Sequence, residues 1–222
     1  GEGAAALFRA ARARGQLTAM DVTWDVEGRW LSVIAPCLPH LAWFLPSVKE
    51  AAKITGLEKP EDMAAFLRDR GAANVVIKLG ERGCYVLPAG RAGFVVPAFR
   101  VQVVDTTGAG DSFVAGFLAG LLRGWEPERS ARLACAAAAL NIQKVGATAG
   151  MPTFAEAGVP GLGSRNPVIT LPLYPPVRLF PKRPPRKSPS STTTWPLTST
   201  QSIPSGGRMP SLNVARSCTR AG

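Results

Sequence analysis

A glycine turn between an extended segment and an apolar helix most constrains the fold of this chain. Gly108 and Gly110 separate the β-branched run 101–104 from an apolar segment that begins near Asp111. Glycine allows backbone conformations that other side chains forbid, so a strand can pass directly into a helix here. The first turn of such a helix leaves N–H groups unpaired, with the positive end of the helix dipole behind them. The turn therefore predicts an anion-binding site at the end of a strand.

Helical and extended segments alternate along the first two thirds of the chain. Helix formers, capping residues and apolar spacing predict helices at 4–14, 47–55, 60–71 and 111–122. A last helix is predicted to begin at Pro127 and to include residues 131–140. Apolar and β-branched runs predict strands at 17–22, 74–79, 84–87, 93–97 and 101–104. Strands that alternate with crossover helices predict a mainly parallel α/β sheet, with a β-meander inserted near its edge.

The helix predicted at 111–122 has two kinds of face. Phe113, Phe117 and Leu121 recur at helical spacing, whereas the residues at 115, 116, 119 and 120 are alanine or glycine. Such a small-residue face allows another element to approach closely.

Asp111 follows the glycine turn directly, where an anion would repel its carboxylate. One explanation is structural, because an acid in the first helical turn stabilises the helix dipole by about 0.3–1 kcal/mol. The other is chemical, because a hydroxyl that attacks a phosphorus atom at this turn needs an acceptor for its proton. The residues of the turn favour neither explanation over the other.

The C-terminal tail, residues 157–222, differs in composition from the rest of the chain. Residues 1–150 hold 17 Lys and Arg against 14 Asp and Glu, whereas residues 151–222 hold 9 against the single Glu156. Thirteen of the 20 prolines also follow residue 150, so we expect the tail to be disordered. The basic segment 181–187 could bind nucleic acid or an acidic membrane, but no aromatic platform accompanies it. We therefore favour an extension without a binding role, and expect no nucleic-acid partner.

Cysteine and histidine usage argues against a metal-thiolate site and a disulfide framework. The chain has one histidine and four scattered cysteines, Cys37, Cys84, Cys135 and Cys218, without a C-x-x-C pair. No apolar run reaches the roughly 18 residues that span a bilayer. These features predict a cytoplasmic protein with no membrane partner.

The segment VVDTTGAGDSFVAGFLAGLL, residues 103–122, resembles the C-terminal signature of the ribokinase-like sugar kinases, the phosphofructokinase B family. Three further segments match that family in order: FLPSVKEAAKITG at 44–56, VVIKLGERG at 75–83 and AAAALNIQKVGATAGMP at 136–152. The resemblance implies a three-layer α/β/α sandwich with a mainly parallel sheet. It also implies that residues 1–156 form the C-terminal, nucleotide-binding part, and that the N-terminal part and the lid are missing.

The resemblance implies transfer of the γ-phosphoryl group of ATP to a hydroxyl of a sugar or sugar-like substrate. Asp111 would be the general base, and the backbone amides of Gly108, Ala109, Gly110 and Asp111 would form the anion hole. Nucleotide contacts would fall on Ser47, Lys78, Leu79, Gly80, Glu81, Arg82, Gly83, Gly110, Asp111 and Cys135. The alanine-rich helix around Cys135 would form the wall of the base pocket, although a buried helix of small residues explains its composition equally well.

Two metal sites are implied by the same resemblance. The family usually has Asn-x-x-Glu where this chain has Ser47-Val-Lys-Glu50, and its carboxylate helps to organise Mg²⁺; Ser-x-x-Glu is also a helix capping box, and both readings of Glu50 stay open. Relatives that bind K⁺ use the positions of Asp105, Thr107, Asn141, Lys144, Gly146 and Gly150. Gly150 lacks the hydroxyl often found there.

Substrate and partners follow from the resemblance alone. It implies a sugar or nucleoside substrate and a homodimer formed through the missing lid. The alternative is a module that binds nucleotide or a partner without catalysis. A dinucleotide-binding domain fits poorly, because Gly108-Ala-Gly110 is not continued as G-x-G-x-x-G.

Overall fold

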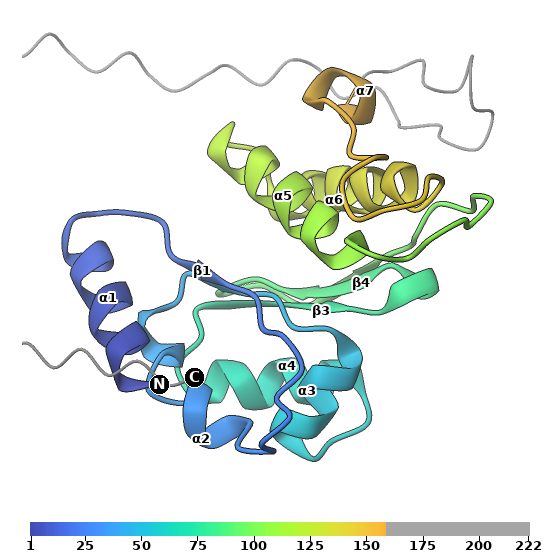
Figure 1. Ribbon diagram of the computed structural model, residues 1–222. Coiled ribbons are helices and arrows are strands. Elements are labelled where there is room, and N and C mark those ends of the chain that lie inside the picture. Colours follow the sequence, from blue (N-terminus) through green and yellow to red (C-terminus); the bar gives the residue numbers. More distant parts are fainter. Residues whose placement is uncertain (159–222) are drawn as a thin grey trace, which may run out of the picture. The chain divides into compact units, whose positions relative to one another are not determined.

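The computed structural model describes residues 1–158, which are built on a five-stranded mixed sheet (Figure 1). Its strands lie side by side in chain order: β1 (Ala19–Met20), β2 (Trp43–Phe44), β3 (Asn74–Lys78), β4 (Cys84–Leu87) and β5 (Phe94–Val96). β1, β2 and β3 run parallel, whereas β4 and β5 continue the sheet in antiparallel pairs. The predicted α/β sheet with a meander at one edge is confirmed.

Helices cover both faces of the sheet (Figure 1). One face carries α3 (Val48–Thr55) and α4 (Pro60–Asp69), with α1 (Glu2–Ala13), α2 (Leu31–Ile34) and the 3-10 helix η1 (Leu38–His40). The other face carries α5 (Ala109–Leu122) and α6 (Pro127–Asn141), followed by the short α7 (Phe154–Gly158). A second 3-10 helix, η2 (Gly80–Arg82), connects β3 to β4. These three layers confirm the predicted α/β/α sandwich.

β3 contributes to the hydrophobic core on each face of the sheet. Val75 and Ile77 pack with Leu67 of α4, whereas Val76 packs with Trp43 and Phe117 on the opposite face. Successive side chains of a strand point to opposite faces, so one β-branched run fills both cores. The end of this central strand is therefore held rigidly, and the site described below is built on it.

α5 and α6 approach each other through glycine. A Cβ atom at Gly116 would lie 2.9 Å from the Cα of Ala134, and one at Gly120 would lie 2.9 Å from the Cα of Ser130. No larger side chain fits at these distances, so the glycines allow the two helices to pack backbone against backbone. The predicted small-residue face of α5 is confirmed.

Two predicted strands differ from the structure. The strand predicted at 101–104 is wrong, because the amides of Val104 and Asp105 both donate to the carbonyl of Ile142, at 2.8 and 3.2 Å, and so cannot join a sheet. The strand predicted at 17–22 is reduced to β1. It ends where the amide of Val22 donates to the Asp21 carboxylate at 2.8 Å instead of to a neighbouring strand.

The predicted boundary at residue 156 falls within α7, in which Ala157 is buried. The predictions for the tail from residue 159 onward, including its basic segment 181–187 and Cys218, concern residues outside the described part and stay predictions. Across residues 1–158, no helix combines the length and apolarity that crossing a membrane requires.

Candidate active site

The glycine turn before α5 requires glycine at its first position. Gly108 has a φ of +75°, in the left-handed region, and a Cβ atom there would lie 2.2 Å from the carbonyl oxygen of Ala147. Both the backbone conformation and the neighbouring loop therefore exclude a side chain. α5 begins at the next residue, so its first turn faces the space in front of β3.

The amides of this turn differ in their hydrogen bonding. The amide of Ala109 donates to the carbonyl of Thr106 at 3.1 Å, which departs from the predicted anion hole of four amides. The amides of Gly108, Gly110 and Asp111 have no acceptor within residues 1–158, because a first helical turn offers none. Three amides at this position are thus available to an anion, and the fourth closes a turn.

Asp111 lies in the first turn of α5 with an exposed side chain. Its carboxylate forms no hydrogen bond or ion pair with any residue in the described part of the chain, unlike the carboxylates of Asp21, Glu50 and Asp105. No group in the described part of the chain therefore holds this carboxylate in place.

A pocket of about 740 Å³ opens in front of the turn. Its lining includes Lys78 at the end of β3, the η2 turn, Gly110 of α5 and Cys135 of α6. The residues of the predicted nucleotide site that line it are Lys78, Gly80, Glu81, Arg82, Gly83, Gly110 and Cys135. The pocket thus brings together segments that lie far apart in the sequence.

Three predicted nucleotide contacts do not line this pocket. Leu79 is buried in the core, and its amide donates to the carbonyl of Gly83 at 2.7 Å, so it shapes the η2 turn. Ser47 caps α3, and Asp111 lies beside the pocket, one residue beyond Gly110. Their side chains are therefore placed to act indirectly or at the pocket edge.

Several lining residues were not predicted. Ala138 and Ala139 follow Cys135 by three and four residues on α6 and share its face, so helical spacing alone could have identified them. Phe99, Arg100, Val101 and Val103 come from the strand predicted at 101–104 and the residues just before it. In a strand, every second side chain would point into a core, so the strand prediction gave no indication that these residues line a pocket.

Cys135 is paired with a second thiol. A hydrogen bond with Cys135, followed by burial, raises the pKa of the Cys84 thiol, and both cysteines belong to the core between the sheet and α6. Cys135 therefore belongs both to this core and to the wall of the pocket.

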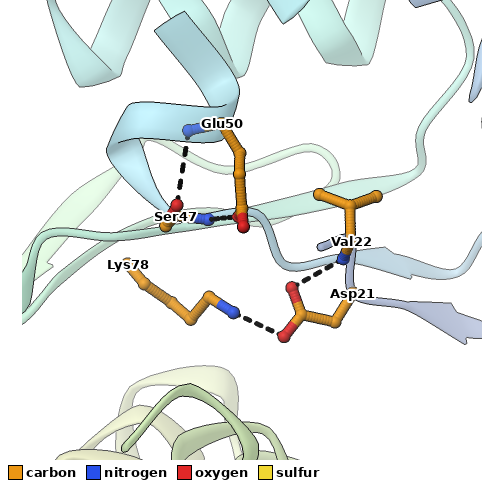
Figure 2. A network of polar contacts seen from close by, with 5 residues as sticks. All are labelled: Asp21, Val22, Ser47, Glu50 and Lys78. Atoms are coloured by element: carbon orange, nitrogen blue, oxygen red, sulfur yellow. Dashed lines mark hydrogen bonds and ion pairs between the residues drawn. The ribbon is translucent and has the colours of Figure 1, made fainter. Parts of the chain in front are cut away.

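Ser47 and Glu50 form a capping box at the start of α3 (Figure 2). The amide of Ser47 donates to Glu50 Oε2 at 2.7 Å, and the amide of Glu50 donates to Ser47 Oγ at 3.3 Å. The capping reading of this motif is confirmed. Glu50 Oε1 has no hydrogen bond within residues 1–158, so one carboxylate oxygen stays available to a ligand.

An ion pair that the sequence analysis missed lies beside the capping box. Lys78 Nζ and Asp21 Oδ2 are 2.5 Å apart, and their side chains are 13% and 25% exposed (Figure 2). Burial raises the pKa of Asp21, and the attraction of Lys78 only partly opposes this shift. Asp21 follows β1 directly and Lys78 ends β3, so the signal was available: carboxyl ends of parallel strands meet at one edge of a sheet.

The residues of the predicted K⁺ site form one loop cluster. Asp105 accepts hydrogen bonds from the amide and hydroxyl of Thr107 and, through Oδ2, from the amide of Gly146 at 2.8 Å. These bonds hold the pKa of Asp105 below its ordinary value. The amide of Lys144 donates to the carbonyl of Asn141 at 3.3 Å.

Asn141 connects this cluster to the glycine turn. Its side-chain nitrogen donates to the carbonyls of Thr107 and Ala147, at 3.3 and 3.0 Å. Its buried Oδ1 has no partner within residues 1–158, and no three His, Cys, Asp or Glu side chains of these residues gather as a metal site. A Cβ atom at Gly150 would lie 2.3 Å from the carbonyl oxygen of Asn141, which explains the missing hydroxyl at that position.

Comparison with known proteins gives a family match that covers most of the chain. Residues 1–154 match the family described as pfkB family carbohydrate kinase. The chain is 37% identical to 2-dehydro-3-deoxygluconokinase of Bacillus subtilis, over 59% of this chain and 40% of that protein. It therefore spans about two fifths of the length of this relative.

The fold is similar to those of solved kinases. Arabidopsis thaliana ribokinase complexed with ribose and ATP matches with a TM-score of 0.64 and 28% identity, over 69% of this chain and 50% of that one. A putative ribokinase II from E. coli in complex with ATP and Mg²⁺ matches with a TM-score of 0.62 and 25% identity, over 68% and 50%. The family match over residues 1–154 and the shared fold lead to one conclusion: this chain belongs to the pfkB family of carbohydrate kinases.

Proposed function

We propose that this chain provides the nucleotide-binding and phosphoryl-transfer part of an ATP-dependent carbohydrate kinase. The observation that carries the proposal is one pocket lined by Lys78, by the η2 turn and by Gly110, whose amide has no acceptor within residues 1–158. The reaction would move the γ-phosphoryl group of ATP to a hydroxyl of a sugar or sugar-like substrate. Catalysis of this kind depends on positioning and on stabilising charge at the transferred group.

Asp111 would act as the general base. Its carboxylate is exposed, has no partner within residues 1–158, and stands next to the amides that would hold the phosphoryl group. A hydroxyl that attacks the phosphorus atom loses its proton, and a free carboxylate beside the attack site can accept it. This explains an acid at a turn that otherwise favours anions.

The amides of Gly108, Gly110 and Asp111 would donate to the oxygens of the transferred group. The amide of Ala109 would join them only by giving up its bond to the carbonyl of Thr106. In other enzymes, removing one donor of this kind lowers the rate by about 10²–10³. The turn would therefore contribute as much to the rate as the base.

The remaining pocket residues would hold the nucleotide. The face of α6 formed by Cys135, Ala138 and Ala139 is flat and apolar, and suits the adenine ring. The η2 turn, with exposed Glu81 and Arg82, would border the ribose and phosphates. Leu79 and Ser47 would contribute by shaping η2 and α3.

Two ions are compatible with the residues present. Mg²⁺ bound with ATP would neutralise phosphate charge, and Glu50 Oε1 is available to hold it or its water. The unpaired Oδ1 of Asn141 suits a K⁺ ion near the 105–107 turn, where Thr107, Lys144 and Gly146 would add backbone carbonyls. Both oxygens of Asp105 already accept hydrogen bonds, so Asp105 would also contribute its carbonyl.

The substrate proposal stays at the level of a sugar or nucleoside. Two of the relatives are named 2-dehydro-3-deoxygluconokinase and ribokinase. Dimerisation through a lid and a cytoplasmic location remain predictions that rest on the family resemblance.

The test compares this chain with a longer protein that also carries the other half of a pfkB kinase domain. The longer protein should form ADP from MgATP in the presence of a suitable member of a panel of ketoses, aldoses, keto-deoxy acids and nucleosides. Asp111→Asn should abolish this turnover while leaving ATP affinity within about twofold. Unchanged turnover in Asp111→Asn would refute the assignment of the base.

A second function fits the 222-residue chain by itself, namely nucleotide binding without transfer. The described residues that line the pocket all lie between Lys78 and Ile142, whereas the chain spans about half of the solved kinase that it matches. Calorimetry should then detect ATP binding by this chain while product assays detect little transfer to any sugar. Robust transfer by the 222-residue chain would favour the first function for this chain as it stands.

A further inference from the structure

Four segments meet around the ammonium group of Lys78. Asp21 follows β1, Ser47 precedes α3, Lys78 ends β3, and Gly110 opens α5. The backbones of Ser47 and Lys78 form an isolated parallel β-bridge. The Asp21 carboxylate, which follows β1, forms the ion pair with the Lys78 ammonium (Figure 2). The position of the ammonium thus depends on a residue far from Lys78 in the sequence.

Stability alone does not explain the Asp21–Lys78 pair. Burial raises the pKa of Asp21 despite the adjacent ammonium, so the charged carboxylate is less favoured here than in water. When the cost of burying the charges exceeds their attraction, an ion pair stabilises the fold no more than apolar residues of similar size would. The pair therefore calls for a functional explanation.

The position of the ammonium supplies that explanation. A Cβ atom at Gly110 would lie 3.4 Å from Lys78 Nζ, so the ammonium stands directly beside the first turn of α5. Lys78 also lines the pocket. An ammonium has three N–H donors, and Asp21 is its only acceptor within residues 1–158. Two N–H groups of the ammonium therefore remain available to an anion bound at the first turn of α5.

We propose that Asp21 is a positioning residue that holds the Lys78 ammonium beside the α5 amides, where it binds the terminal phosphate oxygens of the nucleotide. This inference rests on the proposed function, because it assumes a polyphosphate in the pocket. Without the carboxylate, the long lysine side chain would be free to turn toward water. The carboxylate also keeps the unliganded pocket free of an unpaired buried charge.

The sign of the effect distinguishes positioning from simple charge. Asp21 is negative, so its removal decreases the repulsion of a phosphate and, by itself, tightens ATP binding. If Asp21 acts through Lys78, the loss of a fixed ammonium outweighs this gain and ATP binds more weakly. The two explanations thus predict opposite changes in affinity.

The test is a double-mutant cycle on the 222-residue chain, with MgATP and adenosine as probes. Asp21→Asn should weaken MgATP binding about tenfold and leave adenosine binding unchanged, because adenosine carries no phosphate. In the Lys78→Met background, Asp21→Asn should no longer weaken MgATP binding. Glu126→Gln, which removes one carboxylate from the exposed Arg91–Glu126 pair outside the pocket, controls for net charge and should have no effect.

A second readout follows the ammonium itself. In ¹⁵N spectra of lysine side chains, the Lys78 signal, assigned by its loss in Lys78→Met, should shift when tripolyphosphate is added and should broaden in Asp21→Asn. This measurement on the wild-type chain applies even if Asp21→Asn folds poorly. Asp21→Glu, which keeps the charge but displaces it by one methylene, should restore part of the lost affinity.

Each outcome decides the inference. If Asp21→Asn weakens MgATP binding equally in the wild-type and Lys78→Met backgrounds, or leaves wild-type binding unchanged or tighter, the inference is overturned while the nucleotide site stays intact. A Lys78 signal that does not respond to tripolyphosphate also overturns it. If the wild-type chain binds neither MgATP nor adenosine, the proposed function fails and the inference fails with it.

Discussion

Gly146 donates its backbone amide to Oδ2 of Asp105 at 2.8 Å, and this hydrogen bond ties the loop after α6 to the turn before α5. The other carboxylate oxygen of Asp105 accepts from the amide and hydroxyl of Thr107. One side chain therefore fixes both the entry to the glycine turn and the loop that packs against Gly108. Loss of this carboxylate should therefore disturb the proposed anion site.

Asp105→Asn should lower the thermal stability of the chain at neutral pH. Hydrogen bonds hold the pKa of Asp105 below its ordinary value of 3.8, so its stabilising effect is fully present above that value and is lost as pH falls through the lower, folded-state pKa. Melting temperatures of wild type and variant should differ by a constant amount between about pH 5 and 8. The difference should shrink below about pH 3.9. A constant difference down to the most acidic pH would contradict the assignment to this carboxylate.

Gly108→Ala and Gly110→Ala should differ sharply although they lie two residues apart. Gly108 has a positive φ, and its Cβ would meet the Ala147 carbonyl at 2.2 Å, whereas the nearest atom to a Cβ at Gly110 is the flexible end of Lys78 at 3.4 Å. Urea unfolding should show a loss of about 1–3 kcal/mol for Gly108→Ala and less than about 0.5 kcal/mol for Gly110→Ala. Similar losses for the two variants would show that the turn is less constrained than described.

Gly150→Ser restores the hydroxyl-bearing position expected from the family resemblance, but it should destabilise this chain. The new Cβ would lie 2.3 Å from the carbonyl oxygen of Asn141, so the loop would have to shift, at a cost of about 1–3 kcal/mol in urea unfolding. Gly3→Ser, at a helical site with nothing within 4 Å, is the matched control and should be tolerated. A variant of full stability that gains K⁺-dependent ATP binding would contradict this steric account.

Ala138→Leu should fill part of the pocket. Ala138 lines the cavity on the face of α6 that also carries Cys135, so a leucine there would occupy the space proposed for adenine. We expect both MgATP and adenosine to bind at least about tenfold more weakly, in contrast to Asp21→Asn. Ala10→Leu on the exposed surface of α1 controls for the added side chain. Unchanged adenosine binding in Ala138→Leu would place the base elsewhere.

The features predicted correctly from the sequence depend on residues close together in the chain. The capping box of Ser47 and Glu50, the helix start at Pro60 and the small-residue face of α5 are each encoded within one or two helical turns. The hairpin of β3 and β4 also joins segments that are adjacent in sequence. Local stereochemistry is sufficient to define such elements.

The features that were missed depend on contacts between distant segments. Asp21 and Lys78 are 57 residues apart and meet because β1, β2 and β3 align in parallel. Residues 101–104 have strand-like composition, but the carbonyl of Ile142 takes the amides of Val104 and Asp105. Hydrogen bonding at such a distance leaves no periodic pattern in the sequence.

The η2 turn has a fixed backbone path but carries two exposed charged side chains. Its ends are joined by the bond from the Leu79 amide to the Gly83 carbonyl at 2.7 Å, and a Cβ at Gly83 would meet the Val96 carbonyl at 2.0 Å, so its path is fixed. Glu81 and Arg82 are exposed and reach the pocket from this fixed frame. A combinatorial library restricted to these two codons would therefore vary the charge at the proposed nucleotide site while the backbone stays constant, which makes η2 the natural starting point for changing the proposed nucleotide preference.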